Sequence, residues 1–261
     1  MLDERGLTPK KSLGQNFLVD HNLLRKLVDD AGVGPGDTVL EIGPGAGVLT
    51  RELLERGARV VAVELDAGLA DLLRETIDSD RFTLIEGDAF AGGALSPDAL
   101  DALGDATWSL VANLPYGVAS PLIVDLLVRR PACRSLHVTI QREVAERLTA
   151  SPNTREYGSL GVLAQSLASA ELITLAGPRC FWPPPTVTSA MVSLRRLDEP
   201  LTDRPQAFEG FVRRVFMKRR KQLGGILGRG VAASAGIDPT RRPESLEIGE
   251  LVRLMASADS A

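Results

Sequence analysis

The chain is 261 residues long, with 44% hydrophobic residues and a formal net charge of −4 at pH 7. That length allows one full α/β domain and a smaller second unit. The acidic net charge, taken alone, argues mildly against a nucleic-acid binder, because phosphate contacts need Lys and Arg. No apolar run approaches the roughly eighteen residues of a membrane helix and residues 1–5 do not begin a signal peptide, so we expect a cytoplasmic chain without membrane contact. Cys133, Cys180 and two isolated histidines lack metal-ligand spacing, so we expect no metal site.

Helices and strands alternate over the first two thirds of the chain. Asp20 can cap a helix over residues 20–31, and strands are predicted at residues 38–42, 59–64, 82–85, 108–112 and 136–140. This alternation predicts a doubly wound α/β sheet with right-handed crossovers. Two later β-rich stretches, at 171–176 and 188–196, are expected to pair and close one edge of that sheet.

The composition changes after residue 197. Proline-containing segments at 198–200 and 203–205 predict a linker, and the remaining residues predict short helices separated by Gly and Pro. We therefore predict an α/β catalytic domain over residues 1–197 and a small α-helical domain over residues 198–261.

The second domain contains a basic segment at residues 213–221. Six of its nine residues are Lys or Arg, Phe216 and Met217 interrupt it, and it contains no acidic residue for i,i+4 pairing. A solvated helix face is one interpretation and RNA or phosphate binding is the other, which we favour. The expected RNA-binding residues are Arg213, Arg214, Lys218, Arg219, Arg220 and Lys221.

A glycine-rich loop follows the strand at residues 38–42. Gly43, Gly45 and Gly47 let a ligand approach the backbone at the carboxyl edge of the sheet, where open α/β folds bind ligands. The spacing differs from the G-x-G-x-x-G of dinucleotide folds, and Glu41 beside the loop suits a cationic ligand better than a pyrophosphate. S-adenosylmethionine carries a sulfonium and an ammonium but no phosphate, so we expect it as the cofactor.

Acidic residues stand at the ends of the next two predicted strands. Glu64 follows the loop by about twenty residues, where a carboxylate can accept hydrogen bonds from both ribose hydroxyls. Asp88 can accept a hydrogen bond from the adenine amino group of the cofactor. A ribose contact serves NAD as well, so these two residues alone leave NAD possible.

The segment Asn113-Leu114-Pro115-Tyr116 follows the fourth predicted strand. The exocyclic amine of adenine is a weak nucleophile because its lone pair is delocalised into the ring. The Asn113 side-chain oxygen and a backbone carbonyl can each accept one N–H bond of that amine, which turns the lone pair toward a methyl donor. Pro115 stiffens the loop, and Tyr116 offers a face on which a flipped base can stack. The segment therefore predicts amine methylation.

Together these motifs resemble those of the rRNA adenine N6,N6-dimethyltransferases, and most of all the small-subunit enzymes of that group. The similarity runs in order over about residues 10–225. The segments that carry it are residues 11–18, 40–45, 63–66, 87–89, 113–116, 141–148, 157–160 and 181–189. The resemblance implies a Rossmann-like S-adenosylmethionine-dependent methyltransferase domain followed by a small α-helical RNA-binding domain.

Specific roles follow from the resemblance. It implies cofactor contacts at Asn16, Leu18, Gly43, Glu64, Asp88 and Asn113. It also implies that residues 14–18 fold over the cofactor and that Phe181 flanks the target base opposite Tyr116. Such enzymes dimethylate two adjacent adenosines in a hairpin loop near the 3′ end of 16S rRNA, late in small-subunit assembly. The precursor of the small ribosomal subunit is therefore the expected partner, and we expect a monomer.

Three other hypotheses stay open. A large-subunit rRNA adenine methyltransferase of the macrolide-resistance type would use the same chemistry, but those enzymes are typically strongly basic, whereas the pI here is about 5.4. A non-catalytic assembly factor on the same fold would not need Asn113, Glu64 and Asp88. An NAD-dependent enzyme is the least favoured, because no residue resembles a hydride-transfer group.

Overall fold

The computed structural model describes residues 7–10 and 13–260. Residues 1–5, which we do not expect to begin a signal peptide, and Lys11 and Ser12 of the N-terminal motif lie outside the described residues.

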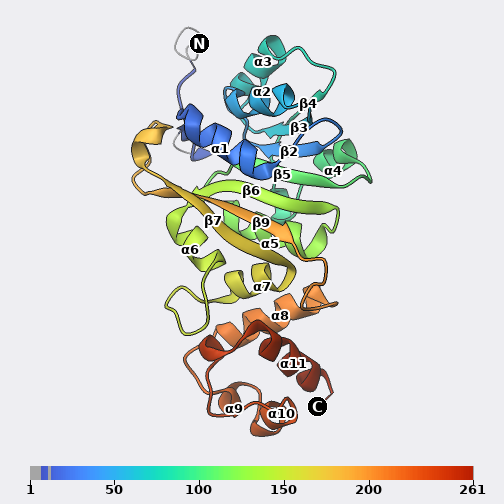
Figure 1. Ribbon diagram of the computed structural model, residues 1–261, viewed down its shortest axis with the longest axis vertical. Helices are drawn as coiled ribbons and strands as arrows, with labels where there is room; N and C mark the ends of the chain where they lie inside the picture. Colours follow the sequence, from blue (N-terminus) through green and yellow to red (C-terminus); the bar gives the residue numbers. More distant parts are fainter. Residues whose placement is uncertain (1–6, 11–12, 261) are drawn as a thin grey trace.

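A seven-stranded sheet with the order β4-β3-β2-β5-β6-β9-β7 forms the centre of the molecule (Figure 1). Neighbouring strands among the first five are parallel, as predicted for a doubly wound α/β sheet. The late pair also closes one edge as expected, with β9 antiparallel to both β6 and β7. The strands are β2 (Thr38–Ile42), β3 (Arg59–Glu64), β4 (Phe82–Glu86), β5 (Trp108–Asn113), β6 (Cys133–Gln141), β7 (Ala168–Ala176) and β9 (Ser189–Arg196).

Helices cover both faces of the sheet. On one face α1 (His21–Ala31) and α2 (Val48–Glu55) pack on a layer that includes Val39 and Val60. On the other face α4 (Pro97–Leu103), α5 (Ala119–Arg129), α6 (Arg142–Leu148) and α7 (Ser159–Leu167) pack on a layer that includes Leu40 and Val61. Successive side chains of a strand point to opposite faces, so hydrophobic residues at consecutive positions supply both cores. The helix α3 (Ala67–Thr76) packs against β3 and β4.

The predicted first helix is confirmed, and local sequence explains both of its ends. The Asp20 side chain accepts hydrogen bonds from the backbone N–H groups of Asn22 and Leu23, which caps the N-terminus of α1. Gly32 ends the helix in a left-handed conformation with φ 64°.

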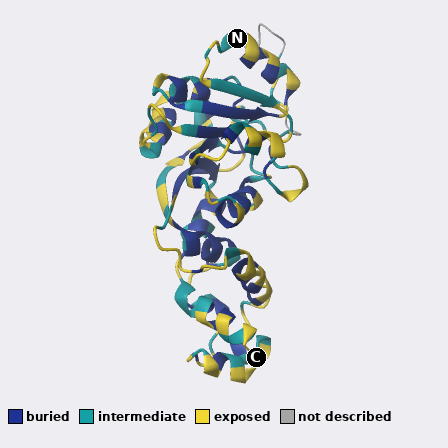
Figure 2. Ribbon diagram, turned by 90° about the vertical axis from the view of Figure 1, so that its right-hand side faces the viewer, coloured by how far each residue is buried: buried dark blue, intermediate teal, exposed yellow. Residues whose placement is uncertain are grey.

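The C-terminal helices extend the molecule away from the sheet (Figures 1 and 2). The first, α8 (Pro205–Phe216), packs on α5 and α7, and its buried Phe208 and Val212 belong to the same hydrophobic core as the sheet. Beyond it lie α9 (Leu223–Ile226), α10 (Arg229–Ser234) and α11 (Ile248–Asp259). The domain boundary after residue 197 remains a prediction. The helix α8 joins the C-terminal segment to the main core.

Two very short strands form a second sheet that the sequence did not predict. β1 (Phe17–Leu18) pairs antiparallel with β8 (Phe181–Trp182), which brings the N-terminal motif beside the proline-rich segment. Two residues are too few to show an alternating pattern, so their pairing depends on the tertiary fold. Single turns of 3-10 helix occur at Ala91–Gly93, Pro178–Cys180 and Pro243–Ser245. Within the described part of the chain, no helix is long and apolar enough to cross a membrane.

Candidate active site

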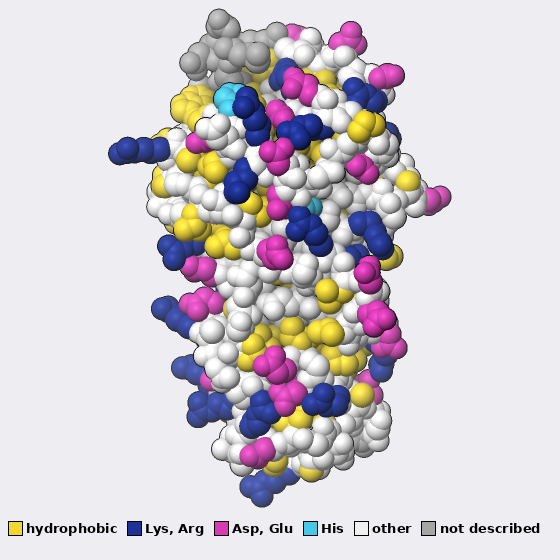
Figure 3. Space-filling model, in the orientation of Figure 1, with side chains coloured by type: hydrophobic (Ala, Val, Ile, Leu, Met, Phe, Trp, Pro, Cys, Tyr) yellow, Lys and Arg dark blue, Asp and Glu magenta, His cyan; other side chains and the backbone are white. Residues whose placement is uncertain are grey.

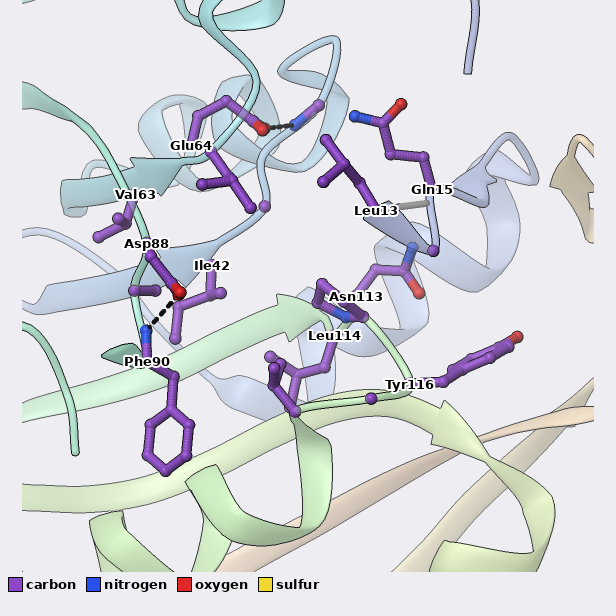
Figure 4. Close-up of a pocket in the computed structure, with 18 of the residues that line it drawn as sticks. Leu13, Gln15, Ile42, Val63, Glu64, Asp88, Phe90, Asn113, Leu114 and Tyr116 are labelled. Atoms are coloured by element: carbon purple, nitrogen blue, oxygen red, sulfur yellow. Dashed lines mark hydrogen bonds between the residues drawn. The ribbon is translucent and has the colours of Figure 1, made fainter. Parts of the chain in front are cut away.

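A cavity of about 450 Å³ opens at the carboxyl ends of β2, β3, β4 and β5. Among its lining residues are nine of the predicted site residues: Asn16, Gly43, Gly45, Glu64, Asp88, Asn113, Leu114, Pro115 and Tyr116. Figure 4 shows Glu64 and Asp88 on one side of this cavity, Asn113 and Leu114 at its centre and Tyr116 on the opposite side. Residues from four different strand ends meet here because parallel strands place their carboxyl ends on the same edge.

Two predicted site residues, Leu18 and Phe181, do not line the cavity. They are partners in the β1–β8 ladder and pack into the core beneath α1 and α2, with only 8% and 3% of their surface exposed. Alternation along β8 turns the neighbouring side chain, Trp182, outward instead, and it is 40% exposed. A direct contact between the Phe181 ring and a base, expected from the resemblance, is therefore not part of this site as the structure has it.

The glycine loop after β2 is shaped by backbone that favours glycine. Gly43, Gly45 and Gly47 have φ values of 68°, 59° and 76°. At Gly45 a Cβ atom would lie 2.7 Å from two ring atoms of Phe17, which itself lines the cavity. The absence of a side chain at Gly45 therefore lets the N-terminal segment (residues 13–17) approach the loop closely.

Glu64 lies at the end of β3 and is 4% exposed. Its Oε2 accepts a hydrogen bond of 3.0 Å from the Gly45 N–H, and its Oε1 accepts one of 2.9 Å from the Asp66 N–H. Burial raises the pKa of this carboxyl, while the hydrogen bonds from the Asp66 and Gly45 N–H groups oppose that rise. Each carboxylate oxygen has a second lone pair, so Glu64 can accept further hydrogen bonds from a ligand in the cavity.

Glu41 does not have the role that its position beside the loop suggested. It is 1% exposed, does not line the cavity and accepts a 2.7 Å hydrogen bond from the Thr50 hydroxyl. Burial raises the pKa of Glu41 to about 8; the Thr50 hydrogen bond opposes this rise and the nearby Glu64 adds to it. The Glu41 carboxyl is therefore mostly protonated at neutral pH and cannot balance a cationic ligand.

Asp88 follows β4 at the exposed rim of the cavity. Its Oδ1 accepts a 2.9 Å hydrogen bond from the Phe90 N–H, which orients the carboxylate (Figure 4). Phe90 also lines the cavity. Ile42 and Leu65 add apolar surface on the same side. Leu65 and Phe90 were missed from the sequence, although each follows closely after an acidic residue at a strand end.

The orientation of the Asn113 side chain is set by the N-terminal segment. Its Nδ2 donates a 2.8 Å hydrogen bond to the backbone carbonyl of Asn16, 97 positions earlier in the chain. With Nδ2 held there, Oδ1 is the group left to accept hydrogen bonds in the cavity. The adjacent Leu114 is held by a 3.1 Å hydrogen bond from its N–H to the Thr139 carbonyl on β6.

The N-terminal segment is itself anchored by Asp66. Lys10 Nζ lies 2.9 Å from Asp66 Oδ2, and Gln15 Nε2 donates to the same oxygen at 3.2 Å. Burial raises the pKa of Asp66, but the contacts with Lys10 and Gln15 outweigh burial and hold this pKa below its ordinary value. The Phe17 ring stacks on Trp182 with ring centroids 6.3 Å apart. The segment thus lines one side of the cavity. That it folds over a bound cofactor stays a prediction.

Tyr116 lies opposite Glu64 and Asp88 and is partly buried. Its hydroxyl shares a 2.7 Å hydrogen bond with the Ser189 hydroxyl on β9. The ring therefore borders the cavity while its hydroxyl end is bound to the sheet.

The basic segment at 213–221 is less uniform than its sequence suggested. Arg213 pairs with Glu209, four residues earlier in α8, at 2.8 Å, so the expectation that no acid was available for i,i+4 pairing was wrong. Arg219 donates hydrogen bonds to the carbonyls of Arg155 and Tyr157 at 3.1 and 3.0 Å, which makes it part of the packing between α8 and the preceding loop. Figure 3 shows basic and acidic side chains interspersed over one face of the molecule.

No group of three or more His, Cys, Asp or Glu side chains that could hold a metal ion occurs within residues 7–10 and 13–260.

Comparison with known proteins places these features in a family. Residues 6–257 match the family described as ribosomal RNA adenine dimethylase. The chain is 42% identical to ribosomal RNA small subunit methyltransferase A from Clostridium botulinum over 260 residues, covering 94% of this chain and 92% of the relative.

Solved structures show the same fold over most of the chain. A dimethyladenosine transferase from Plasmodium falciparum superimposes with a TM-score of 0.78 at 23% identity, covering 94% of this chain and 98% of the other, which is evidence for the fold alone. The 23S rRNA methyltransferase ErmE superimposes with a TM-score of 0.70 at 28% identity, covering 94% of this chain and all of the other. The expectations of a Rossmann-like methyltransferase fold and of this resemblance are confirmed. The chain belongs to the ribosomal RNA adenine dimethylase family.

Proposed function

We propose that this protein transfers methyl groups from S-adenosylmethionine to the N6 amines of two adjacent adenosines in a hairpin loop near the 3′ end of 16S rRNA. The observation that carries the proposal is the Asn113 amide, whose Nδ2 is held by the Asn16 carbonyl, so that Oδ1 is left to accept a hydrogen bond from an amine. The cavity around it has carboxylates on one side and a tyrosine ring on the other. Family membership and the small-subunit methyltransferases among its relatives support the same substrate.

The cavity suits S-adenosylmethionine. Glu64 retains acceptor capacity for the ribose hydroxyls, and Asp88 retains it for the adenine amino group. Leu65 and Phe90 supply apolar walls for the adenine ring, while Gly43 leaves room beside the loop: a Cβ there would come no nearer than 3.9 Å to any atom outside its immediate neighbours. When bound, S-adenosylmethionine supplies an electrophilic methyl group on a sulfonium.

The residues after β5 make the target amine nucleophilic. Asn113 Oδ1 and the Leu114 carbonyl accept one N–H bond each from the adenine amine, so its lone pair turns out of conjugation with the ring. That lone pair would form the new N–C bond as the bond between the methyl group and sulfur breaks, the electron pair of the broken bond staying on sulfur. One proton leaves the amine for solvent after each transfer. Pro115 adds no competing N–H donor, and its own carbonyl is occupied by the Val118 N–H at 3.2 Å. Catalysis at this site is therefore positioning and hydrogen bonding, without a general base.

The RNA surface that we propose uses the unpaired part of the basic segment. Arg214, Lys218, Arg220 and Lys221 are exposed, and none of them has an ion pair to a described residue. Arg213 and Arg219 instead border an open hollow of about 800 Å³ between α6 and α8, where they mix with Glu143 and Glu146. These four cations can contact phosphates without first breaking an ion pair, and each contact releases counterions condensed on the RNA, which favours binding. We propose the small-subunit precursor as partner and a cytoplasmic monomer as the acting form.

The direct test is incubation of undermethylated small subunits and, in parallel, of large-subunit rRNA with labelled S-adenosylmethionine, followed by mass spectrometry of each rRNA. We expect two dimethyladenosines in 16S rRNA. Label in large-subunit rRNA would favour the macrolide-resistance type of activity instead. Tight subunit binding without any label would favour a non-catalytic assembly factor.

Substitution of Asn113 tests the assigned chemistry. We expect Asn113→Ala to lower methyl transfer roughly 100-fold or more, because an acceptor aimed at the reacting amine is lost. Cofactor binding should remain measurable by calorimetry, since Glu64 and Asp88 are unchanged. Asn22→Ala, the same change at an exposed position on α1, is the matched control. Turnover of Asn113→Ala at the wild-type rate would remove Asn113 from the mechanism.

Substitution of Glu64 tests the cofactor site. Glu64→Ala removes an acceptor for the ribose and leaves the N–H groups of Gly45 and Asp66 without their partner. We expect this variant to weaken cofactor binding more than any other single change in the cavity. An unchanged dissociation constant would show that the ribose lies elsewhere.

A further inference from the structure

Ser189 is the first residue of β9, 73 positions after Tyr116 in the chain, and does not line the cavity itself. Its hydroxyl is 2.7 Å from the Tyr116 hydroxyl, and either group can donate. We infer that Ser189 is a positioning residue for the target base: its hydroxyl holds the Tyr116 ring in the orientation on which the flipped adenine stacks. This inference rests on the proposed function, which makes Tyr116 the stacking surface.

The sheet fixes the Ser189 hydroxyl in space. Ser189 is completely buried, and its backbone pairs with Gln141 on β6 and with Ala176 on β7, so strands hold it from both sides. The next residue, Ala190, is also fully buried. A hydroxyl on such a strand has little freedom to move, in contrast to one on a loop.

Tyr116, in contrast, stands on a loop. It lies between β5 and α5 and is followed by Gly117, where an added Cβ would have no atom within 4 Å. Without a second attachment, the ring could turn about χ1 into the open space beside the cavity. The bond to Ser189 attaches the far end of the ring, so that the loop holds one end and β9 holds the other. Such two-point attachment lowers the entropy lost when a base stacks on the ring.

The same bond argues against a chemical role for the Tyr116 hydroxyl. Figure 4 shows this hydroxyl directed away from Asn113, where the amine would be held. Its hydrogen bond to Ser189 occupies it at the edge of the sheet. The Tyr116 ring face therefore stacks on the base, and the Tyr116 hydroxyl serves only to hold the ring through its bond to Ser189.

The test compares Ser189→Ala, Tyr116→Phe and the double variant, all assayed as full-length protein on undermethylated small subunits. Each single variant removes one partner of the same bond, and Tyr116→Phe keeps the ring itself. We expect each to lower kcat/KM for subunits about tenfold, with the dissociation constant for S-adenosylmethionine unchanged. The double variant should be no worse than either single variant, because the bond can be lost only once.

Ser193→Ala is the matched control on the same strand. Ser193 is 1% exposed and its Oγ has no hydrogen-bond partner among the described residues, so the same atom is removed without breaking a bond. We expect wild-type kcat/KM for this control and recovery of activity in Ser189→Thr, which retains the hydroxyl. If Ser189→Ala does not fold, Tyr116→Phe carries the test, since Tyr116 is only partly buried.

A second measurement separates positioning from general stability. Fluorescence of 2-aminopurine at the target position reports stacking of the flipped base, and we expect less quenching in Ser189→Ala and Tyr116→Phe than in Ser193→Ala. Wild-type stacking and kcat/KM in both variants would overturn the inference while the protein still methylates 16S rRNA. Failure of the wild-type protein to methylate 16S rRNA would instead overturn the proposed function.

Discussion

Replacing Gly45 with alanine crowds the contact between the glycine loop and Phe17 of the N-terminal segment. Gly45 has φ 59°, and a Cβ there would lie 2.7 Å from Cδ1 and Cε1 of Phe17. A left-handed conformation costs a residue with a Cβ about 1 kcal/mol of stability. The Phe17 ring must also retreat by roughly 1 Å to restore a normal carbon–carbon separation.

The retreat of the ring affects cofactor binding. Phe17 lines the cavity and stacks on Trp182, and such an aromatic pair contributes about 1 kcal/mol. Loss of this stacking lowers the stability of the protein with and without cofactor, whereas the displaced cavity wall weakens binding of S-adenosylmethionine by Gly45→Ala, and we expect a five- to tenfold larger dissociation constant. The strain of the left-handed backbone is present with and without cofactor, so it lowers the melting temperature and leaves the affinity unchanged.

A matched variant separates the two effects. Gly32 has φ 64° at the exposed end of α1, and no atom lies within 4 Å of its added Cβ. Gly32→Ala should therefore lose about 1 kcal/mol of stability and keep the wild-type affinity in calorimetry. In a Phe17→Ala background, Gly45→Ala should weaken binding little further, because the ring that it displaces is gone. Wild-type affinity in Gly45→Ala, or an equal loss in Gly32→Ala, would refute this reasoning.

Two further predictions concern buried and exposed charge. Burial raises the pKa of Glu41 to about 8, from 4.5 in the unfolded chain. The contribution of this carboxyl to stability is therefore complete below pH 4.5 and falls by about 1.4 kcal/mol per pH unit as the pH rises toward 8. Glu41→Gln should flatten that slope in urea titrations between pH 5 and 8; an unchanged slope would mean that another group causes it. Replacing both Arg220 and Lys221 by alanine should reduce the slope of log K against log salt concentration for RNA binding by about 1.5. The control Arg219→Ala should mainly lower stability, because its hydrogen bonds to two backbone carbonyls are lost. Equal salt slopes in the double variant and the wild type would place the RNA surface elsewhere.

The parallel half of the fold could be predicted from the sequence because its signals are local. The strands from β2 to β6 are segments rich in Val, Leu and Ile, and the connections between them contain Gly, Pro or Asp. The short ladder between β1 and β8 could not be predicted, because two residues carry no periodicity and their partner is more than 160 positions away. That ladder decides that Leu18 and Phe181 face the core.

The sequence alone determined which groups reach the carboxyl edge of the sheet. Gly43, Glu64, Asp88 and Asn113 each stand at the end of a strand, and parallel strands bring such ends together whatever the loops do. Only the tertiary structure decided how those groups are oriented. The Asn16 carbonyl orients the Asn113 amide, and β9 brings Ser189 beside Tyr116. Both contacts join segments that are far apart in the sequence, so they depend on tertiary packing and not on a local sequence pattern. Burial decided in the same way that Glu41, next to the loop in sequence, is a neutral core residue rather than a ligand for the cofactor.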